Sequence, residues 1–287
     1  MFTRADLEAV AFPAEGLDGQ TRQVLGLLQA RELSRSFRLP MWEVERQALE
    51  WGISPWHYER NLATFGVEGQ LKLLRSRVSV VGLGGLGGWV AEVLARAGVG
   101  FLSLVDGDLF VETNLNRQLF SSTRNLGQNK AKVAKRRLQA VNPGIRLEAI
   151  PVFLDDENAD LLLGDMDVIV DALGDLTNRA LLYRQARRLN LTVVHGAIGG
   201  LFGQLALVEP GGPGLEGAYG PLEELPAHGQ ELFLGTPSPT PAVLGALQAQ
   251  VVLQVLLGQN ALPGAGMLRG ALFFLDLDHF HWTRVAL

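Results

Sequence analysis

An α/β fold with a mostly parallel sheet, covered by helices on both faces, is predicted by three observations. Short and almost continuously apolar runs recur along the chain, and periodic helical stretches separate them. Parallel strands have this composition when helices bury both faces of their sheet. A glycine cluster also follows the first apolar run, Val78–Val81, directly, as expected where a buried strand turns tightly into a helix.

The expected elements alternate from residue 77 onwards. Strands are predicted at Val78–Val81, Phe101–Val105, Leu147–Val152, Val168–Ala172 and Thr192–His195. Helices are predicted between them at Leu86–Ala97, Lys130–Val141, Asn158–Leu163 and Asn178–Leu189. After Gln204 the pattern changes to an alternating strand, a long apolar helix and two short terminal strands. This last part of the sheet is expected to be antiparallel.

Two regions lie outside the alternation. Residues 1–55 look helical and lack strand alternation, and the break Gly52–Trp56 marks a boundary. We therefore expect an N-terminal helical extension (1–55), with a role in packing or docking, and one further domain (56–287). The stretch Gly211–Pro239 has no clear pattern, and loops of that length are usually functional or disordered.

Composition excludes several kinds of chemistry. The 287 residues include no cysteine, which excludes disulfides, thiolate zinc sites and thioester or persulfide intermediates on this chain. The net charge of −5 makes nucleic-acid binding an unlikely main activity. The first ten residues carry acids and no apolar core of signal-peptide length, and glutamines interrupt the apolar helix Pro241–Gly258. We expect a cytoplasmic protein without a membrane partner.

The glycine cluster is the first functional motif. Gly82, Gly84 and Gly87 form G-x-G-x-x-G, with Gly85 between them, after a strand and at the start of a helix. Such a turn lets phosphates approach the backbone and the free N–H groups of the helix. Asp106, at the end of the next strand, is placed to bind a ribose. The motif predicts a nucleotide but leaves NAD, FAD and ATP open.

The loop after the second strand separates these nucleotides. It contains Asn114, Arg117 and Gln118, and Lys130 begins the next helix. A triphosphate with a leaving pyrophosphate needs more cations and amides than a dinucleotide does. Arg117 and Lys130 fit that need, although ordinary surface charge is the alternative. Surface charge is also our interpretation of four basic residues further along the same helix: Lys132, Lys135, Arg136 and Arg137.

At this point the sequence resembles the MoeB/ThiF/HesA family of adenylating proteins, which are relatives of ubiquitin-activating enzymes. The resemblance rests on "GLGGLGG", "VDGDLFVETNLNRQLF", "NLGQNKAKVAKRRLQAVNP", "TPAVLGALQA" and the upstream "HYERN" and "EGQLKL". It covers residues 57–287, so the domain at 56–287 would be an ATP-binding adenylating domain. Membership would imply that the C-terminal glycine of a small ubiquitin-like sulfur-carrier protein, ending in Gly-Gly, attacks the α-phosphate of ATP with Mg²⁺. An acyl-adenylate would form and pyrophosphate would leave.

The resemblance also implies roles for individual residues. Arg60 would be an arginine donated across a homodimer to the partner's ATP. The phosphates would be held by Asn114, Arg117, Gln118 and Lys130, and the nucleotide would be bound by Gly82, Gly84, Gly85, Gly87, Asp106 and Asp108. Without a cysteine, the adenylate would pass to an external nucleophile. The Gly211–Pro239 loop would cross over the substrate tail.

One departure concerns the metal. The family's "DALDN" reads "DALGD" here, so Gly174 stands where the metal-binding aspartate belongs and Asp175 follows it. We interpret Asp175 as a shifted substitute, because a glycine beside it lets the backbone adjust. No zinc is expected, since His279 and His281 lack a visible third ligand. His195 is interpreted as a core residue.

Three other functions stay open from the sequence. The first is adenylation of a small-molecule or tRNA-borne carboxylate. The second, motivated by Gly174, is a nucleotide-binding interaction protein with weakened catalysis. A NAD oxidoreductase ranks last, because it would leave Asn114, Arg117 and Lys130 without a purpose.

Overall fold

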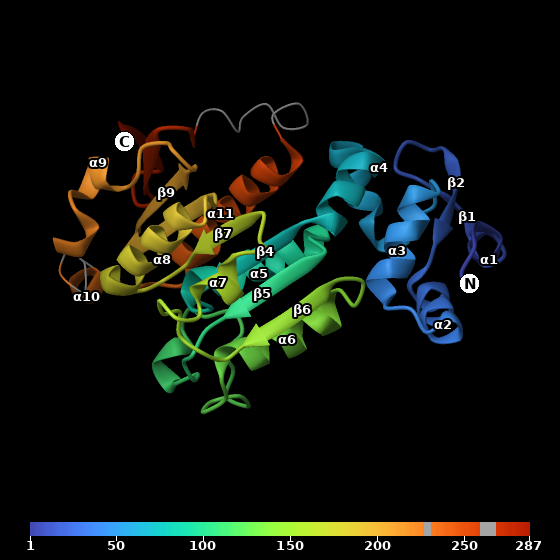
Figure 1. Ribbon diagram of the computed structural model, residues 1–287, viewed down its shortest axis with the longest axis horizontal. Helices are drawn as coiled ribbons and strands as arrows, with labels where there is room; N and C mark the ends of the chain where they lie inside the picture. The colour runs from blue at the N-terminus through green and yellow to red at the C-terminus, as the bar shows by residue number, and fades with distance from the viewer. Residues whose placement is uncertain (225, 227–230, 259–267) are drawn as a thin grey trace.

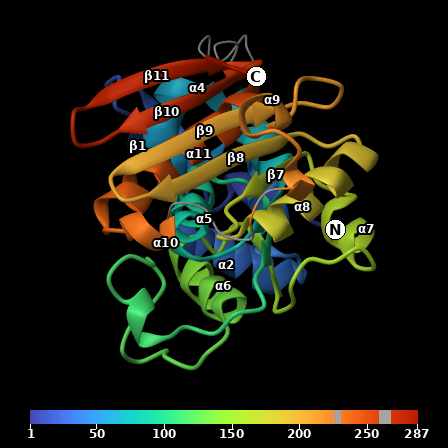
Figure 2. The same cartoon turned by 90° about the vertical axis from the view of Figure 1, so that its left-hand side faces the viewer.

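A computed structural model describes residues 1–224, 226, 231–258 and 268–287 of the chain. The main body is an eight-stranded sheet with the strand order β11-β10-β9-β8-β7-β4-β5-β6 (Figure 1). Its parallel strands are β4 (Arg77–Val81), β5 (Phe101–Val105), β6 (Arg146–Ile150), β7 (Val168–Asp171) and β8 (Val193–Gly199). The antiparallel strands are β9 (Phe202–Val208), β10 (Ala271–Asp276) and β11 (His281–Ala286). These three strands lie side by side at one edge of the twisted sheet (Figure 2).

Helices cover both faces of this sheet, as predicted. One face packs against α5 (Gly85–Ala97), α6 (Lys130–Val141), α11 (Pro239–Leu257) and the second half of α4 (Glu59–Arg75). The other face packs against α7 (Ala159–Leu163) and α8 (Leu176–Arg188). The α/β class, the mostly parallel sheet and the antiparallel C-terminal strands are therefore confirmed. Every predicted strand and helix lies within a few residues of its observed bounds.

Helix α11 is the apolar helix predicted near the C-terminus. Its length and hydropathy would suit a membrane span, but 61% of its most apolar window is buried inside the molecule. It packs against α5, β8 and β9, so the prediction of a buried helix is confirmed. The preceding segment is irregular, as expected, apart from short helical turns in its described part: α9 (Glu216–Tyr219), η3 (Leu222–Glu224) and α10 (Glu231–Leu234).

The N-terminal extension corrects one expectation. Its helices are confirmed as α1 (Arg4–Glu8), α2 (Leu27–Phe37) and α3 (Met41–Glu50). It also contains a three-stranded sheet of β1 (Phe12–Glu15), β2 (Thr21–Leu25) and β3 (Ser54–Pro55), so the expectation that strands are lacking is wrong. The strands are short, and β1 contains a proline, which weakens the sequence signal for a strand. The division at residue 55 stays a proposal.

A separate small core holds this N-terminal unit together. It contains seven buried apolar side chains, from α1, α2, α3, β2 and the residue before β3: Leu7, Leu25, Ala30, Leu33, Val44, Ala48 and Ile53. Figure 1 shows the unit at one end of the molecule, beside α4. Leu49 of α3 instead belongs to the core of the main body, so α3 joins the two parts.

Glu45 of α3 is buried at this joint without a charge partner. Its side chain is 0% exposed and packs against Gly144 and Tyr58. Within the described residues neither carboxylate oxygen has a hydrogen bond of good geometry, and His57 Nε2 lies 3.6 Å away. Burial raises the pKa of Glu45 to about 8, and the neighbouring Tyr58 hydroxyl only partly opposes this effect.

Glu45 should therefore make the stability of the protein depend on pH. Its folded-state pKa lies above the unfolded value of 4.5, so the unfolded state loses its proton first as the pH rises. The contribution of Glu45 to the free energy of unfolding should therefore fall between pH 4.5 and about 8, by roughly 3 kcal/mol up to pH 7. Burial lowers the pKa of the neighbouring His57 to about 4, which gives a contribution of opposite sign, so the Glu45 slope is the difference between wild type and a Glu45 variant. Thermal unfolding of Glu45→Gln should lack this slope and occur at a higher temperature than wild type at pH 8. The same slope in both proteins, with the exposed Glu32→Gln as control, would contradict the assignment.

Candidate functional site

A cavity of about 520 Å³ opens at the carboxyl ends of β4, β5 and β7. β4 lies between the other two strands, and the strand order reverses there. After β4 the chain forms β5 and β6 on one side, and it then crosses to form β7 on the other side. Ligands bind at such switch points in open α/β sheets. Of the twelve residues predicted for the site, ten line the cavity: Gly82, Gly84, Gly85, Asp106, Asp108, Asn114, Arg117, Gln118, Lys130 and Asp175.

The glycine turn forms the floor of the cavity. Gly82 has φ +90°, and a Cβ there would lie 2.6 Å from the carbonyl oxygen of Ala172. A Cβ on Gly87 would lie 1.8 Å from the carbonyl oxygen of Gly82, so Gly87 allows α5 to pack on the turn and lies outside the lining. Gly84 is the N-cap of α5 and offers no side-chain cap. The first N–H groups of α5 are therefore available to an anion.

Asp106 braces the glycine turn from the end of β5. Its two carboxylate oxygens accept hydrogen bonds from the N–H groups of Leu83 at 2.7 Å and Asp108 at 2.8 Å. Burial raises the pKa of Asp106, while the Lys130 cation and the two N–H groups act in the opposite direction. Each oxygen keeps a lone pair, so Asp106 can still accept hydrogen bonds from ribose hydroxyls.

Lys130 and Asp108 form an ion pair at the rim. Lys130 Nζ lies 2.9 Å from Asp108 Oδ2, with the lysine side chain 9% exposed and the aspartate 56% exposed. The backbone N–H of Lys130 donates to the carbonyl of Asp108 at 2.9 Å. Asn129 caps α6 by accepting from Lys132 N. Lys130 is thus held at the start of a helix, and its ammonium keeps two further donors for phosphate oxygens.

The loop between β5 and α6 brings the remaining polar side chains to the cavity. Asn114 and Gln118 are buried, and Gln118 Oε1 lacks a hydrogen-bond partner within the described part of the chain. Asn114 Oδ1 accepts from the N–H of Val111 at 3.1 Å. Arg117 donates to Thr113 O at 2.8 Å and to Asn116 Oδ1 at 3.0 Å. The unpaired amide and the two cations suit a highly charged phosphate chain.

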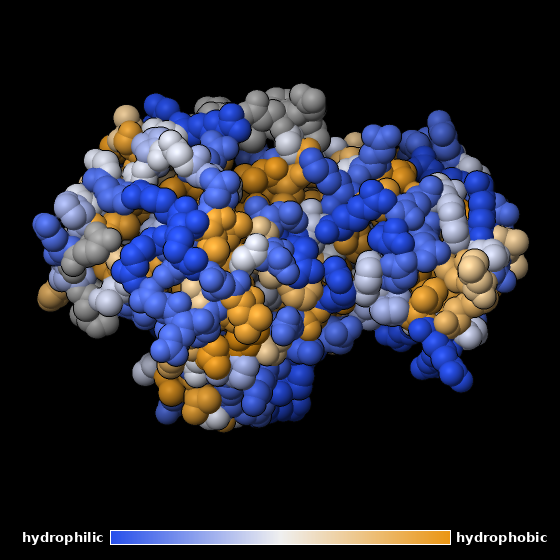
Figure 3. All heavy atoms as spheres, viewed as in Figure 1, coloured by the Kyte–Doolittle hydropathy of each residue, from blue (hydrophilic) through white to orange (hydrophobic). Residues whose placement is uncertain are grey.

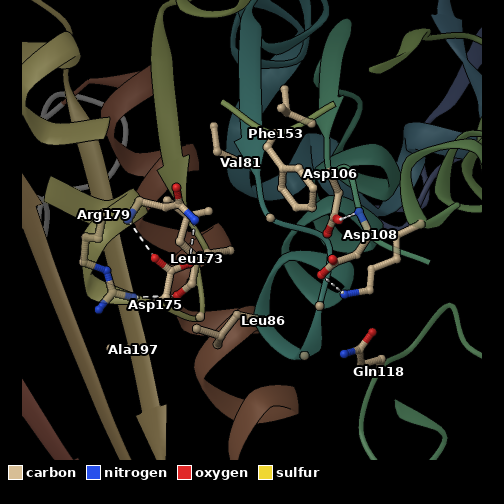
Figure 4. Close-up of a pocket in the computed structure, with 18 of the residues that line it drawn as sticks. Val81, Leu86, Asp106, Asp108, Gln118, Phe153, Leu173, Asp175, Arg179 and Ala197 are labelled. Carbon is tan, nitrogen blue, oxygen red and sulfur yellow. Dashed lines mark hydrogen bonds and ion pairs between the residues drawn. The ribbon is translucent and has the colours of Figure 1, made fainter. Parts of the chain in front are cut away.

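Gly174 and Asp175 also line the cavity, and Figure 4 shows Asp175 across the cavity from Asp108. Asp175 caps α8: its Oδ1 accepts from Asn178 N at 2.7 Å, and its Oδ2 accepts from Asn178 Nδ2 at 2.8 Å. A Cβ on Gly174 would meet no atom within 4 Å. No group of three or more metal-binding side chains occurs in the described ranges. Mg²⁺ often needs only one or two carboxylates beside substrate phosphates, which Asp175 can supply.

Arg60 does not line the cavity. It is exposed near the start of α4, and the neighbouring Asn61 donates to the carbonyl of Ala97 at 3.4 Å. Ala97 ends α5, whereas Gly85 at the cavity begins it. These ends are separated by roughly 18 Å at 1.5 Å per helical residue. Arg60 therefore lies beyond reach of the cavity in its own chain.

Arg179 was not predicted as a site residue, although it lines the cavity. Its guanidinium is 2.9 Å from Asp171 Oδ2, and Nη2 donates to Leu173 O at 2.7 Å and Gly196 O at 3.3 Å. Burial would raise the pKa of Asp171, but the Arg179 cation and the hydrogen bond with His195 outweigh it and lower that pKa. Arg179 thus ties the loop that carries Asp175 to β8.

Phe153 is a second lining residue that the sequence did not indicate. It follows β6, is 60% exposed, and its ring packs against Gly107, where a Cβ would lie 2.7 Å from the ring. Figure 4 shows it above Asp106. An exposed aromatic residue directly after a strand was the available signal, and its flat face can contact a nucleotide base.

None of the three histidines that the sequence singled out lines the cavity. His195 is fully buried, with Nδ1 2.8 Å from Asp171 Oδ2, so it is a core residue. His279 and His281 are exposed, and His279 pairs with Asp276 at 2.9 Å.

Comparison with known proteins agrees with this geometry. The model of the ThiF family matches residues 58–287. A sulfur carrier protein adenylyltransferase from Thermus thermophilus is 39% identical over 227 residues, covering 74% of this chain and 80% of that protein. The SAMP-activating enzyme E1 of Haloferax volcanii is 33% identical, with 74% and 76% covered. The name of the Thermus protein describes adenylation of a sulfur carrier protein, and the name of the Haloferax protein describes activation of SAMP.

Solved structures show the same fold at lower identity. E. coli MccB crystallised with ATP has a TM-score of 0.67 at 22% identity, and the alignment covers 80% of this chain and 70% of that one. The chain TcdA (CsdL) has a TM-score of 0.61 at 23% identity, covering 72% and 96%. The family match, together with the glycine turn and the lysine-bearing helix beside it, leads to one conclusion: the chain belongs to the ThiF family, the adenylating proteins that its motifs resemble.

Proposed function

We propose that this chain is an adenylyltransferase that activates the C-terminal glycine carboxylate of a small ubiquitin-like sulfur-carrier protein with ATP. The observation that carries the proposal is the grouping of the open α5 N-terminus with Arg117 and Lys130 around one cavity. This grouping provides donors for three linked phosphates rather than two. The names of the Thermus and Haloferax relatives support the carrier as substrate.

In the proposed reaction a carboxylate oxygen attacks the α-phosphorus of ATP. The bond from that phosphorus to the bridging oxygen breaks, pyrophosphate leaves, and an acyl-adenylate remains. Asp106 orients the ribose, and the glycine turn accepts the phosphates through its N–H groups. Lys130 and Arg117 neutralise the charge that moves onto pyrophosphate. Because the sequence contains no cysteine, the activated tail passes to an external nucleophile.

Mg²⁺ would screen the phosphates when bound, and Asp175 is the residue that we propose to hold it. The carboxylate of Asp175 also caps α8, so loss of metal binding must be separated from loss of the cap. Asparagine is as good an N-cap as aspartate and carries no charge. Asp175→Asn therefore removes the metal ligand and keeps the cap.

We expect Asp175→Asn to lose carrier-dependent exchange of labelled pyrophosphate into ATP and to keep its melting temperature and nucleotide binding. Adding Gly174→Asp should restore exchange, because the space beside Gly174 is open and the pair then reads Asp-Asn as in the family. Unchanged exchange in Asp175→Asn would refute the metal role. Full nucleotide binding without exchange in wild type would instead favour the weakened nucleotide-binding protein.

The same exchange assay tests the substrate. Labelled pyrophosphate should enter ATP only when a carrier ending in Gly-Gly is present. Exchange that needs a small carboxylate or a tRNA-borne carboxylate instead would replace this proposal with that alternative. Nucleic acid alone should have no effect.

We also propose that the chain works as a homodimer. Arg60 lies at the opposite end of α5 from the cavity of its own chain, so it can contact ATP only in a second copy. Helix α11 supports a second copy as well. Val243 is 41% exposed and Leu247 and Val255 are half-buried, although the apolar side chains of such a helix are normally covered. Figure 3 shows one face of the molecule, where apolar patches interrupt the polar surface.

A further inference from the structure

Helix α4 is divided at Gly66. The backbone there has φ 67° and ψ 173°, which is far from helical and separates residues 59–65 from residues 67–75. We call residues 59–65 the arm. The second part runs into β4 and packs on the main core through Leu73 and Leu74. Because the helix is interrupted there, the direction of the arm depends on the side-chain contacts that hold it rather than on a continuous helix.

The N-terminal unit contacts the first residue of the arm. Glu59 is 8% exposed, and its Oε1 accepts a hydrogen bond from the N–H of Leu17 at 3.3 Å. Arg22 Nη1 lies 3.8 Å from the same oxygen. A Cβ on Gly16 would come within 2.7 Å of it, so the turn between β1 and β2 closes tightly around the carboxylate.

The main body holds the other side of the arm. Tyr58, directly before it, is fully buried, and its hydroxyl accepts from Asn142 Nδ2 at 2.9 Å. Asn61 donates to Gln70 Oε1 at 3.0 Å. Tyr58 and Asn61 therefore fix where the arm is attached, and Glu59 is its link to the N-terminal unit.

Between these two anchored positions lies Arg60. It is exposed, and within the described residues its guanidinium makes no hydrogen bond or ion pair. We propose that residues 1–55 are a brace for the arm: through Glu59 they set the direction in which Arg60 is presented to the cavity of a second copy. This inference rests on the proposed function, and it assigns a positioning role to a unit outside the match to the ThiF family.

Glu59→Ala tests the brace in the full-length protein. Misplacing a reacting group by about 1 Å can cost ~100-fold in rate, so we expect carrier-dependent pyrophosphate exchange to fall roughly 10- to 100-fold. The dissociation constant of ATP, measured by calorimetry, should stay unchanged. Glu59→Gln keeps the acceptor for Leu17 and should retain most of the exchange. Arg4→Ala, which removes only a surface pair with Glu8 on α1, should have no effect.

A double-mutant cycle shows whether the loss acts through Arg60. In an Arg60→Ala background, Glu59→Ala should cause no further loss, because the positioned group is already absent. The inference is overturned if Glu59→Ala exchanges like wild type, or if its full loss persists in the Arg60→Ala background. If Glu59→Ala folds poorly, Arg22→Ala should show a smaller loss in the same direction.

Mixing variants separates this inference from the proposed function. Arg60→Ala mixed with Lys130→Ala should recover exchange, since one site of the mixed dimer has an intact Lys130 and an Arg60 from the other copy. Failure to recover would refute the trans role of Arg60. If this mixture recovers exchange while Glu59→Ala alone exchanges like wild type, the trans role of Arg60 stands and only the bracing role of residues 1–55 is refuted.

Discussion

Replacing Lys130 with alanine is expected to abolish adenylation while leaving the protein folded. The ammonium is a buried cation that lines the cavity, and its partner Asp108 is 56% exposed. Loss of one charge-stabilising donor typically costs ~10²–10³ in rate, and we expect at least that loss in carrier-dependent pyrophosphate exchange. The melting temperature should change little, because water solvates the released Asp108.

Lys132→Ala is the matched control for this prediction. Lys132 lies on the same helix and is exposed, so the Lys132→Ala variant should exchange pyrophosphate like wild type. Equal losses in both variants would show that the charge of the helix as a whole, and not Lys130 in the cavity, supports the reaction. Wild-type exchange by Lys130→Ala would remove the phosphate role altogether.

The variant Arg179→Leu is expected to have the largest effect on stability. It leaves the carboxylate of Asp171, which is 0% exposed, buried without its cation. Removing one partner of a buried ion pair usually costs ~3–5 kcal/mol, and chemical denaturation should show a loss of that order. Exchange should also be lost, because Leu173 and Gly196 are no longer tied together beside Asp175.

Combining Asp171→Asn with Arg179→Leu distinguishes the effect of the buried charge on stability from the effect of lost side-chain packing. The double variant removes the buried charge, so it should be more stable than Arg179→Leu alone. Arg184→Leu, five residues further along α8 and in an exposed pair with Asp156, should cost little stability. If the stability lost by the double variant equals the sum of the losses of Asp171→Asn and Arg179→Leu, the ion pair does not account for the stability.

Local spacing in the sequence was enough to predict the nucleotide turn. Strand, glycines and helix are consecutive, so Gly82 and Gly84 could be placed without knowing the fold. Asp106 follows because parallel strands end at one edge of a sheet. Lys130 could be placed by similar reasoning. It is the first residue of the helix that follows the β5 loop, and that loop starts at the edge of the sheet where the parallel strands end.

Contacts between distant segments could not be predicted in this way. Arg179 joins Leu173 to Gly196 across two strands, and a single helical arginine gives no sign of that. Arg60 matches a motif, but only the structure shows that α5 separates it from its own cavity. The strands of the N-terminal unit were missed because residues 12–15 contain a proline and pair with a strand that has only one clearly apolar end, Val24–Leu25.

The most direct test of the account is calorimetric titration of the purified protein with two nucleotides. ATP with Mg²⁺ should bind one site per chain, and Lys130→Ala should bind it more weakly. NAD should give no saturable heat. If the protein binds NAD and ignores ATP with Mg²⁺, the cavity is built for two phosphates rather than three, and the proposed adenylation is wrong.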